Sequence, residues 1–170
     1  MMKNIILTGF MGTGKTAVGR ELSRLLNMRL VDVDAEIEDS RKMKITDIFK
    51  NFGEPFFRDL ETEMIRKLAH AKNAVISTGG GAVLRQENME ALRTTGVVFC
   101  LYADPETIIA RVGSSNDRPL LAVEDPLAKI KELLRARMPF YEKAGIMIDT
   151  NGRTPLEVAE EIAGIIGCKR

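Results

Sequence analysis

Short apolar runs alternate along the chain with longer segments in which apolar residues recur every three or four positions. This alternation predicts a parallel β-sheet whose strands are connected by helices. The apolar runs predict five strands, at residues 4–8, 29–33, 74–78, 97–102 and 146–149. The amphipathic segments predict helices at residues 15–26, 34–41, 45–51, 54–71, 87–95, 105–112, 127–143 and 155–166. The expected fold class is therefore α/β, with a five-stranded parallel sheet flanked by helices in three layers.

Composition supports a single globular domain spanning residues 1–170. The chain is 45% hydrophobic and 29% charged, which is too apolar for intrinsic disorder. Its net charge of +1 gives no reason to expect nucleic acid or an anionic membrane as a partner. No apolar run approaches the ~18 residues that a membrane span needs. We expect a cytoplasmic monomer that binds small molecules.

A polar segment at about residues 113–125 interrupts the alternating pattern. It is rich in Gly, Ser, Asn, Asp and Pro, and it is too long for a tight connection between helices. Long loops in compact domains are often functional lids, so we expect a mobile lid here. The alternative is an inert surface loop.

A phosphate-binding motif follows the first predicted strand. Residues 9–16 read GFMGTGKT and match the pattern G-x-x-x-x-G-K-[ST] at every position. The glycines let backbone N–H groups point at phosphate oxygens, Lys15 adds a cation for the β- and γ-phosphates, and Thr16 offers a hydroxyl to Mg²⁺. The motif also opens a helix, whose N-terminus favours anions. These features predict a nucleoside triphosphate site.

The rest of the chain narrows the class of nucleotide-binding protein. It contains no N-K-x-D motif of the kind that reads guanine in GTPases. Motor and AAA-type ATPases are much longer and usually carry acidic residues after an apolar strand. Here the strand at 74–78 is followed by the three glycines Gly79, Gly80 and Gly81. A small kinase remains.

Two carboxylates follow the second predicted strand. Asp32 and Asp34 lie two residues apart, so strand pleating is expected to send both side chains to the same side. Ligands bind at the carboxyl ends of strands in open α/β sheets. One carboxylate can hold the water shell of Mg²⁺ while the other orients or deprotonates an attacking hydroxyl. Alternatively, Asp34 caps the following helix.

Other residues carry weaker signals. Arg58 and Glu61 are three apart on a predicted helix and can pair, which taken alone indicates a solvated surface pair. The triple glycine allows close approach of backbone to a ligand, or else forms a flexible turn. Arg118, in the predicted lid, can close over transferring phosphates. By composition alone, Arg118 and Arg137 are more typical of surface charges.

Taken in order, the motifs resemble those of one family. The series is GFMGxGKT, DxD, FRxxE, STGGG, RPLL and RxPxY, and it is similar to that of the shikimate kinases over essentially the whole chain. The resemblance implies a P-loop kinase fold. It also implies transfer of the γ-phosphoryl group of ATP to the 3-hydroxyl of shikimate, a step of aromatic amino-acid biosynthesis.

The resemblance also implies roles for individual residues of the acceptor site, on helices at about residues 34–62 and on later elements. Asp34 would contact the ring hydroxyls and serve as the base, and Arg58 and Arg137 would bind the shikimate carboxylate. Gly80 would offer its backbone within the turn of Gly79, Gly80 and Gly81. Phe49 and Phe57 would form walls against the ring.

For the nucleotide, the resemblance implies a loop made of Gly12, Thr13, Gly14, Lys15 and Thr16. Mg²⁺ would be served by Thr16 and, through water, by Asp32. Arg118 would be the lid arginine, catalytic together with Lys15 and Asp34, and Arg153 would pack against adenine. Two other readings stay open, a gluconate-type or nucleoside monophosphate kinase and a nucleotide-gated binding module without catalysis.

Overall fold

A computed structural model describes residues 3–113, 121 and 123–167, and its strands confirm the predicted sheet. The strands are β1 Asn4–Gly9, β2 Arg29–Asp32, β3 Ala74–Ser77, β4 Gly96–Tyr102 and β5 Ile146–Asp149. They form one sheet in the order β2-β3-β1-β4-β5, in which every neighbouring pair is parallel. Most of the predicted lid, at 114–120 and 122, lies outside the described residues, so the lid stays a prediction.

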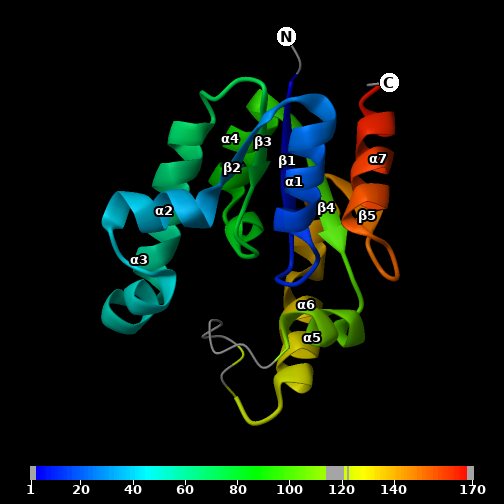
Figure 1. Ribbon diagram of the computed structural model, residues 1–170. Coiled ribbons are helices and arrows are strands. Elements are labelled where there is room, and N and C mark those ends of the chain that lie inside the picture. The colour runs from blue at the N-terminus through cyan, green and yellow to red at the C-terminus, as the bar shows by residue number, and fades with distance from the viewer. Residues whose placement is uncertain (1–2, 114–120, 122, 168–170) are drawn as a thin grey trace.

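The helices follow the predicted order with small shifts at their ends (Figure 1). They are α1 Lys15–Leu26, α2 Val33–Arg41, α3 Ile45–Leu68, α4 Gln86–Thr95, α5 Pro105–Val112, α6 Pro126–Ala144 and α7 Pro155–Ile165. A short 3₁₀ helix, η1 Ala82–Leu84, was not predicted. The two helices expected at 45–51 and 54–71 are halves of α3, which is interrupted where Gly53 has φ 81° and ψ 170°.

Alternating side chains of the strands bury both faces of the sheet, which makes three layers. On β1, Ile5 and Leu7 belong to one core cluster with residues of α1 and α7. Ile6, between them, belongs to a second cluster with residues of α3, α4 and α6. Figure 1 shows α1 and α7 on one side of the sheet and α3 and α4 on the other. This confirms the expected α/β fold class.

The sheet topology brings the carboxyl ends of three strands together. β1 lies between β3 and β4, with Leu7 in register with Ser77 on one side and with Phe99 on the other. Asp32, the last residue of β2, is in register with Ser77. The phosphate loop after β1, the carboxylates after β2 and the glycines after β3 therefore share one edge, where α/β sheets bind ligands.

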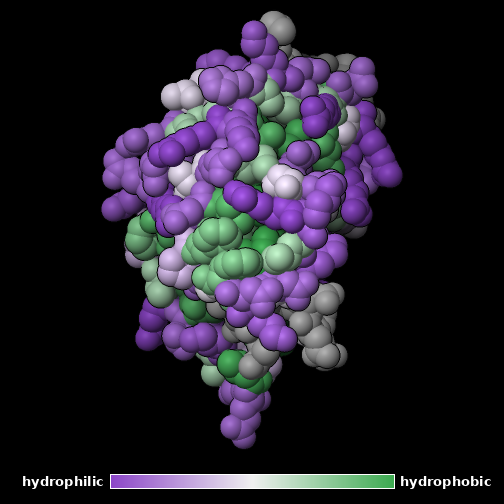
Figure 2. Space-filling model, turned by 90° about the vertical axis from the view of Figure 1, so that its left-hand side faces the viewer, coloured by the Kyte–Doolittle hydropathy of each residue, from purple (hydrophilic) through white to green (hydrophobic). Residues whose placement is uncertain are grey.

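The surface over α2 and α3 is largely hydrophilic, with a smaller apolar area near its middle (Figure 2). On α3, Phe52 and Phe56 are exposed, and their rings pack against each other with centroids 4.9 Å apart. Within the described part of the chain, no helix has both the length and the apolarity needed to cross a membrane.

Candidate active site

Two adjoining cavities lie at the carboxyl edge of the sheet. One has a volume of about 320 Å³ and is lined by the phosphate loop, and the other has a volume of about 410 Å³ and lies among α2, α3, the glycine turn and α6. Five residues line both cavities: Met11, Asp32, Asp34, Gly79 and Gly80. The site therefore has a phosphate half and a second half, with two carboxylates at their junction.

The phosphate loop is closed around its lysine. The Lys15 Nζ donates to the backbone carbonyls of Gly9 and Phe10, each at 2.8 Å. Gly12 has φ 73° and Gly14 has φ 98°, conformations that favour glycine. The buried hydroxyl of Thr13 donates to the Phe10 carbonyl at 2.7 Å, so the side chain of Thr13 stabilises the loop by a hydrogen bond within it.

Asp32 caps helix α2, and this corrects two expectations about Asp34. The carboxylate of Asp32 accepts hydrogen bonds from the N–H groups of Asp34 and Ala35, at 3.0 and 3.2 Å. The alternative that Asp34 is the cap is therefore wrong. The pleating argument is wrong as well, because β2 ends at Asp32 and Asp34 lies in the first turn of α2. The helix nevertheless turns Asp34 toward the same cavities as Asp32.

Asp32 also faces the phosphate loop. Its second carboxylate oxygen accepts a hydrogen bond from the Thr16 hydroxyl at 3.3 Å. A hydroxyl and a carboxylate beside a phosphate loop are oxygen ligands of the kind that Mg²⁺ prefers. The predicted metal residues, Thr16 and Asp32, are thus brought together.

Asp34 lies at the junction in an environment that disfavours its charge. Its Oδ1 is buried and has no hydrogen-bond partner among the described residues. Burial, together with the negative charges of Glu61 and Asp32, raises the pKa of Asp34 to about 7. The positive charges of Lys15 and Arg58 act in the opposite direction on this pKa without cancelling the rise.

Arg58 and Glu61 form a buried ion pair, so the expectation of a solvated surface pair is wrong. The Arg58 Nη1 donates to the Glu61 Oε2 at 2.8 Å, and the Glu61 side chain is 0% exposed. The Nε and Nη2 of Arg58 donate to the Glu54 Oε1 at 3.2 and 2.9 Å. The pair is buried because this face of α3 packs inward against the glycine turn, which the periodicity of the helix alone does not reveal.

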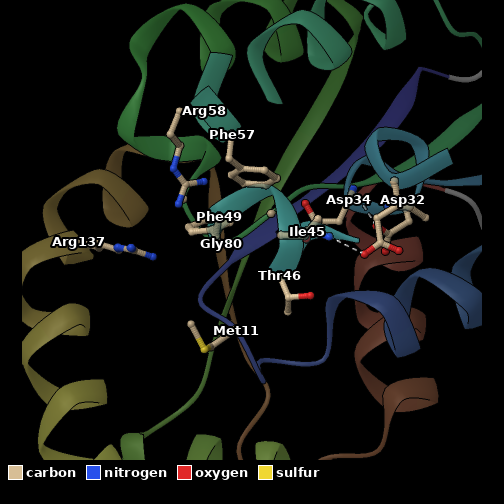
Figure 3. Close-up of a pocket in the computed structure, with 14 residues that line it drawn as sticks. Met11, Asp32, Asp34, Ile45, Thr46, Phe49, Phe57, Arg58, Gly80 and Arg137 are labelled. Carbon is tan, nitrogen blue, oxygen red and sulfur yellow. Dashed lines mark hydrogen bonds between the residues drawn. The ribbon is translucent and has the colours of Figure 1, made fainter. Parts of the chain in front are cut away.

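Aromatic rings and a second arginine complete the larger cavity (Figure 3). The rings of Phe49 and Phe57 pack with centroids 4.9 Å apart. Arg137, from α6, is buried and lies over the Phe10 ring at 5.8 Å. In Figure 3, Arg137 and Arg58 lie on one side of the cavity, and Asp34 lies on the other. The cavity thus has a cationic end and an anionic end.

Of the predicted nucleotide residues, Arg153 is not brought into this site. Arg153 is described, but it is not among the residues that line either cavity. Its guanidinium donates to the carbonyls of Asp149 and Glu157 and pairs with Glu161 within α7. Arg118 lies outside the described residues, and its role stays a prediction.

Sequence reasoning missed Arg111, which lines the phosphate half of the site. Its Nη1 donates to the Gly12 carbonyl at 3.3 Å and to the Thr150 hydroxyl at 2.9 Å, and its Nη2 donates to the Thr150 carbonyl at 2.6 Å. The available signal was weak, a single arginine in the last turn of the helix before the predicted lid. Tyr141 was not predicted from the sequence either, and its hydroxyl donates to the Gly80 carbonyl at 2.6 Å.

Comparison with known proteins places this site in a family. The family model described as shikimate kinase matches residues 11–166. A shikimate kinase of Thermodesulfovibrio yellowstonii is 55% identical over 161 residues, which cover 95% of this chain and 93% of the relative.

Solved structures give the same result. The structure of a shikimate kinase from Acinetobacter baumannii in complex with shikimate is similar with a TM-score of 0.95 and 39% identity, covering 98% of this chain and 93% of that one. A gluconokinase from Sinorhizobium meliloti, at 15% identity and a TM-score of 0.60, shares the fold alone. Because the family model and these relatives span nearly the whole chain, the chain belongs to the shikimate kinase family.

Proposed function

We propose that this protein transfers the γ-phosphoryl group of ATP to the 3-hydroxyl of shikimate. The observation that carries the proposal is the position of Asp34, which lines both the phosphate-loop cavity and the cavity with two arginines at its far end. The hydroxyl group of an acceptor molecule bound in the second cavity would lie between this carboxylate and the phosphates. Membership of the family names the donor and the acceptor.

The nucleotide phosphates bind in the loop after β1. The backbone N–H groups of Gly12–Thr16, which lead into the N-terminus of α1, supply donors for the phosphates, and Lys15 supplies charge. Arg111, which lines the same cavity, donates to the Gly12 carbonyl of this loop. We retain Arg118 as the lid arginine and Arg153 as the adenine contact on the family resemblance alone.

The shikimate carboxylate binds between Arg58 and Arg137. The contacts of Arg58 with Glu54 and Glu61 use three of its five N–H donors, which leaves two that no described residue occupies and that a ligand carboxylate can use. Two parallel N–H groups of a guanidinium match a carboxylate bidentately. Phe49 and Phe57 pack against the ring, and the backbone N–H of Gly80, in the turn of Gly79–Gly81, meets a ring hydroxyl.

Asp34 accepts the proton of the attacking hydroxyl. The O–H bond breaks toward the carboxylate while the oxygen forms its bond to the γ-phosphorus and the bond to the ADP oxygen breaks. Phosphoryl transfer leaves the protein mainly positioning and electrostatic stabilisation to supply. Lys15 and Arg118 act on the charge of the transferring group. The oxygens of Thr16 and Asp32 fit Mg²⁺, which when bound neutralises charge on the β- and γ-phosphates.

A coupled assay of ADP release tests the proposal, with shikimate, gluconate and nucleoside monophosphates as acceptors. We expect turnover with shikimate, and phosphorus NMR of the product should place the phosphate on the 3-oxygen. The methyl ester of shikimate keeps the hydroxyls but loses the carboxylate charge, so it should be a far poorer acceptor. Turnover with gluconate or a monophosphate in place of shikimate would overturn the assignment.

A further inference from the structure

Gly81 has a backbone conformation that does not require glycine. Its φ of −99° and ψ of 0° lie on the side of the Ramachandran map that any L-residue can adopt. By contrast, Gly12 and Gly14 in the phosphate loop have positive φ values. The reason for a glycine at position 81 must therefore lie in what surrounds it.

The space beside Gly81 is filled by the guanidinium of Arg58. A Cβ placed on Gly81 would lie 2.5 Å from the Arg58 Nη1 and closer still to its Cζ and Nη2, which is nearer than real Cβ contacts come. At the preceding Gly80 the nearest atom to such a Cβ is the Met11 nitrogen at 3.3 Å. The guanidinium thus lies directly against the backbone of Gly81, on the hydrogen that replaces a side chain.

The turn that carries Gly81 is held from both sides. The Tyr141 hydroxyl donates to the Gly80 carbonyl at 2.6 Å, and the Asn88 side chain donates to the Ala82 carbonyl at 3.0 Å. Arg58, by contrast, places its guanidinium at the end of a flexible side chain. A methyl group at position 81 would therefore displace the arginine and leave the turn in place.

Among the described residues, the side chains that hydrogen-bond to the guanidinium come from the same helix as Arg58. Glu54 and Glu61 are one turn before and one turn after it on α3, and they fix its edges. Contacts within one helix orient the arginine relative to α3, but they do not set its distance from the rest of the cavity. The backbone of Gly81, which is not part of α3, sets this distance because the guanidinium lies against it.

We propose that Gly81 is a positioning residue for Arg58, because the missing side chain at position 81 lets the guanidinium lie against the turn at the depth where it meets the acceptor carboxylate. This inference deepens the proposed function and rests on it for the identity of the acceptor. It differs from direct binding of substrate by Gly81, since the effect passes through Arg58.

A double-mutant cycle separates the two roles. Gly81→Ala is introduced into the wild-type chain and into the Arg58→Ala variant, and shikimate affinity is measured by calorimetry. In the wild-type background we expect affinity to fall roughly 10- to 100-fold, the effect of losing charged hydrogen bonds. In the Arg58→Ala background we expect almost no further loss, because the group that the methyl displaces is gone.

Equal losses in the two backgrounds would overturn the proposal, since Gly81 would then act without Arg58. ATP affinity should stay unchanged in Gly81→Ala. The added methyl should also lower the melting temperature less in the Arg58→Ala background than in the wild-type chain, because the clash is absent there. In the Arg58→Lys background, the compact ammonium can avoid the methyl, so Gly81→Ala should cost less than it does beside arginine.

A measurement without acceptor tests the positioning by itself. The NMR signal of the Arg58 Nε–H, identified by its loss in Arg58→Ala, reports the bond to Glu54 in the ligand-free protein. We expect this signal to shift and exchange faster with solvent in Gly81→Ala, while Gly164→Ala, with nothing near its added Cβ, leaves it in place. An unchanged signal in Gly81→Ala would refute the positioning role even if the acceptor were not shikimate.

Discussion

At the scale of single residues, the structure separates the functions of two neighbouring carboxylates. Asp32 caps α2 and accepts a bond from Thr16, so its oxygens are committed to the fold and to the phosphate loop. Asp34 keeps a buried oxygen without a partner in the described structure. A group that serves the fold is normally hydrogen-bonded when buried. The unpaired oxygen is therefore consistent with a group kept for a ligand.

The substitution Asp34→Asn should strongly lower kcat and leave the stability of the fold almost unchanged. The proposed role of Asp34 as the base predicts that this substitution lowers kcat roughly 10²- to 10⁴-fold, the usual range for such assistance. The melting temperature should barely change, because the cap of α2 is Asp32. Steady-state kinetics and thermal unfolding check both points. Asp32→Ala is the contrasting variant and should lose about 1 kcal/mol of stability with its cap. An Asp34→Asn variant with wild-type kcat would end the base hypothesis.

The carboxyl of Asp34 should titrate near neutrality in the ligand-free protein. Burial and the charges of Glu61 and Asp32 raise its pKa to about 7, so the carboxyl is protonated below this pH and ionised above it. The form able to accept a proton therefore increases as the pH rises through 7. Carbon NMR of the labelled carboxyl measures the midpoint, and Asp32→Asn should move it to lower pH by removing a like charge. A midpoint near 4 in the wild-type protein would contradict this account.

At the scale of elements, helix α3 forms two walls of the larger cavity, the acceptor cavity of the proposed function, because the helix is broken in the middle. Phe49 lies before the break, and Phe57 and Arg58 lie after it. At Gly53 the backbone has φ 81° and ψ 170°, a region that is open essentially to glycine alone. The break redirects the helix so that residues from both halves face one cavity.

Gly53→Ala should weaken both the fold and acceptor binding. A Cβ in this conformation costs about 1–3 kcal/mol, and relief of the strain would move Phe49 relative to Arg58. We expect a lower melting temperature and a higher KM for shikimate, with the KM for ATP nearly constant. Gly164→Ala is a matched control, because Gly164 is in the helical part of α7 and an added Cβ meets nothing within 4 Å. It should be neutral or slightly stabilising. Equal effects of the two substitutions would refute the explanation.

At the scale of the whole molecule, what sequence could predict depended on how local the signal was. The five strands and the phosphate loop follow from runs of a few residues, and both were predicted. The break in α3 was also predictable, from a glycine and a proline two residues apart. The burial of the Arg58–Glu61 pair was not, because a pair three residues apart on a helix has the same pattern whether solvent or another element covers it.

Arg111 shows the same limit over a longer range. It is one residue among 25 lysines and arginines, and no motif marks it. Its partners, Gly12 and Thr150, lie 99 and 39 residues away in the chain. The sheet brings these segments together, since β1, β4 and β5 are neighbours and the loops after them meet at one edge. The contact exists only once the sheet has assembled.

Arg111→Ala should therefore act on the nucleotide half of the site. The guanidinium joins the phosphate loop to the turn after β5, and the Thr150 hydroxyl donates to the Thr13 carbonyl at 3.0 Å within the same network. Losing charged hydrogen bonds to buried groups costs about 1.5–3 kcal/mol, so ATP affinity should fall by roughly 10- to 100-fold. Shikimate affinity, measured without nucleotide, should stay within a factor of about two, because Arg111 does not line the acceptor cavity as described.

Arg93→Ala is the matched control for this substitution. The guanidinium of Arg93 also donates to backbone carbonyls, those of Lys143 and Ala144 at the end of α6, so its loss should lower stability by a similar amount. It lies away from the phosphate loop, among residues of a separate surface cavity, so nucleotide affinity should be unaffected. Calorimetry with an ATP analogue that is not hydrolysed compares the two variants. If both variants lose nucleotide affinity equally, the effect of Arg111→Ala comes from general destabilisation. If only Arg111→Ala loses nucleotide affinity, Arg111 itself couples the loop after β5 to the phosphate site.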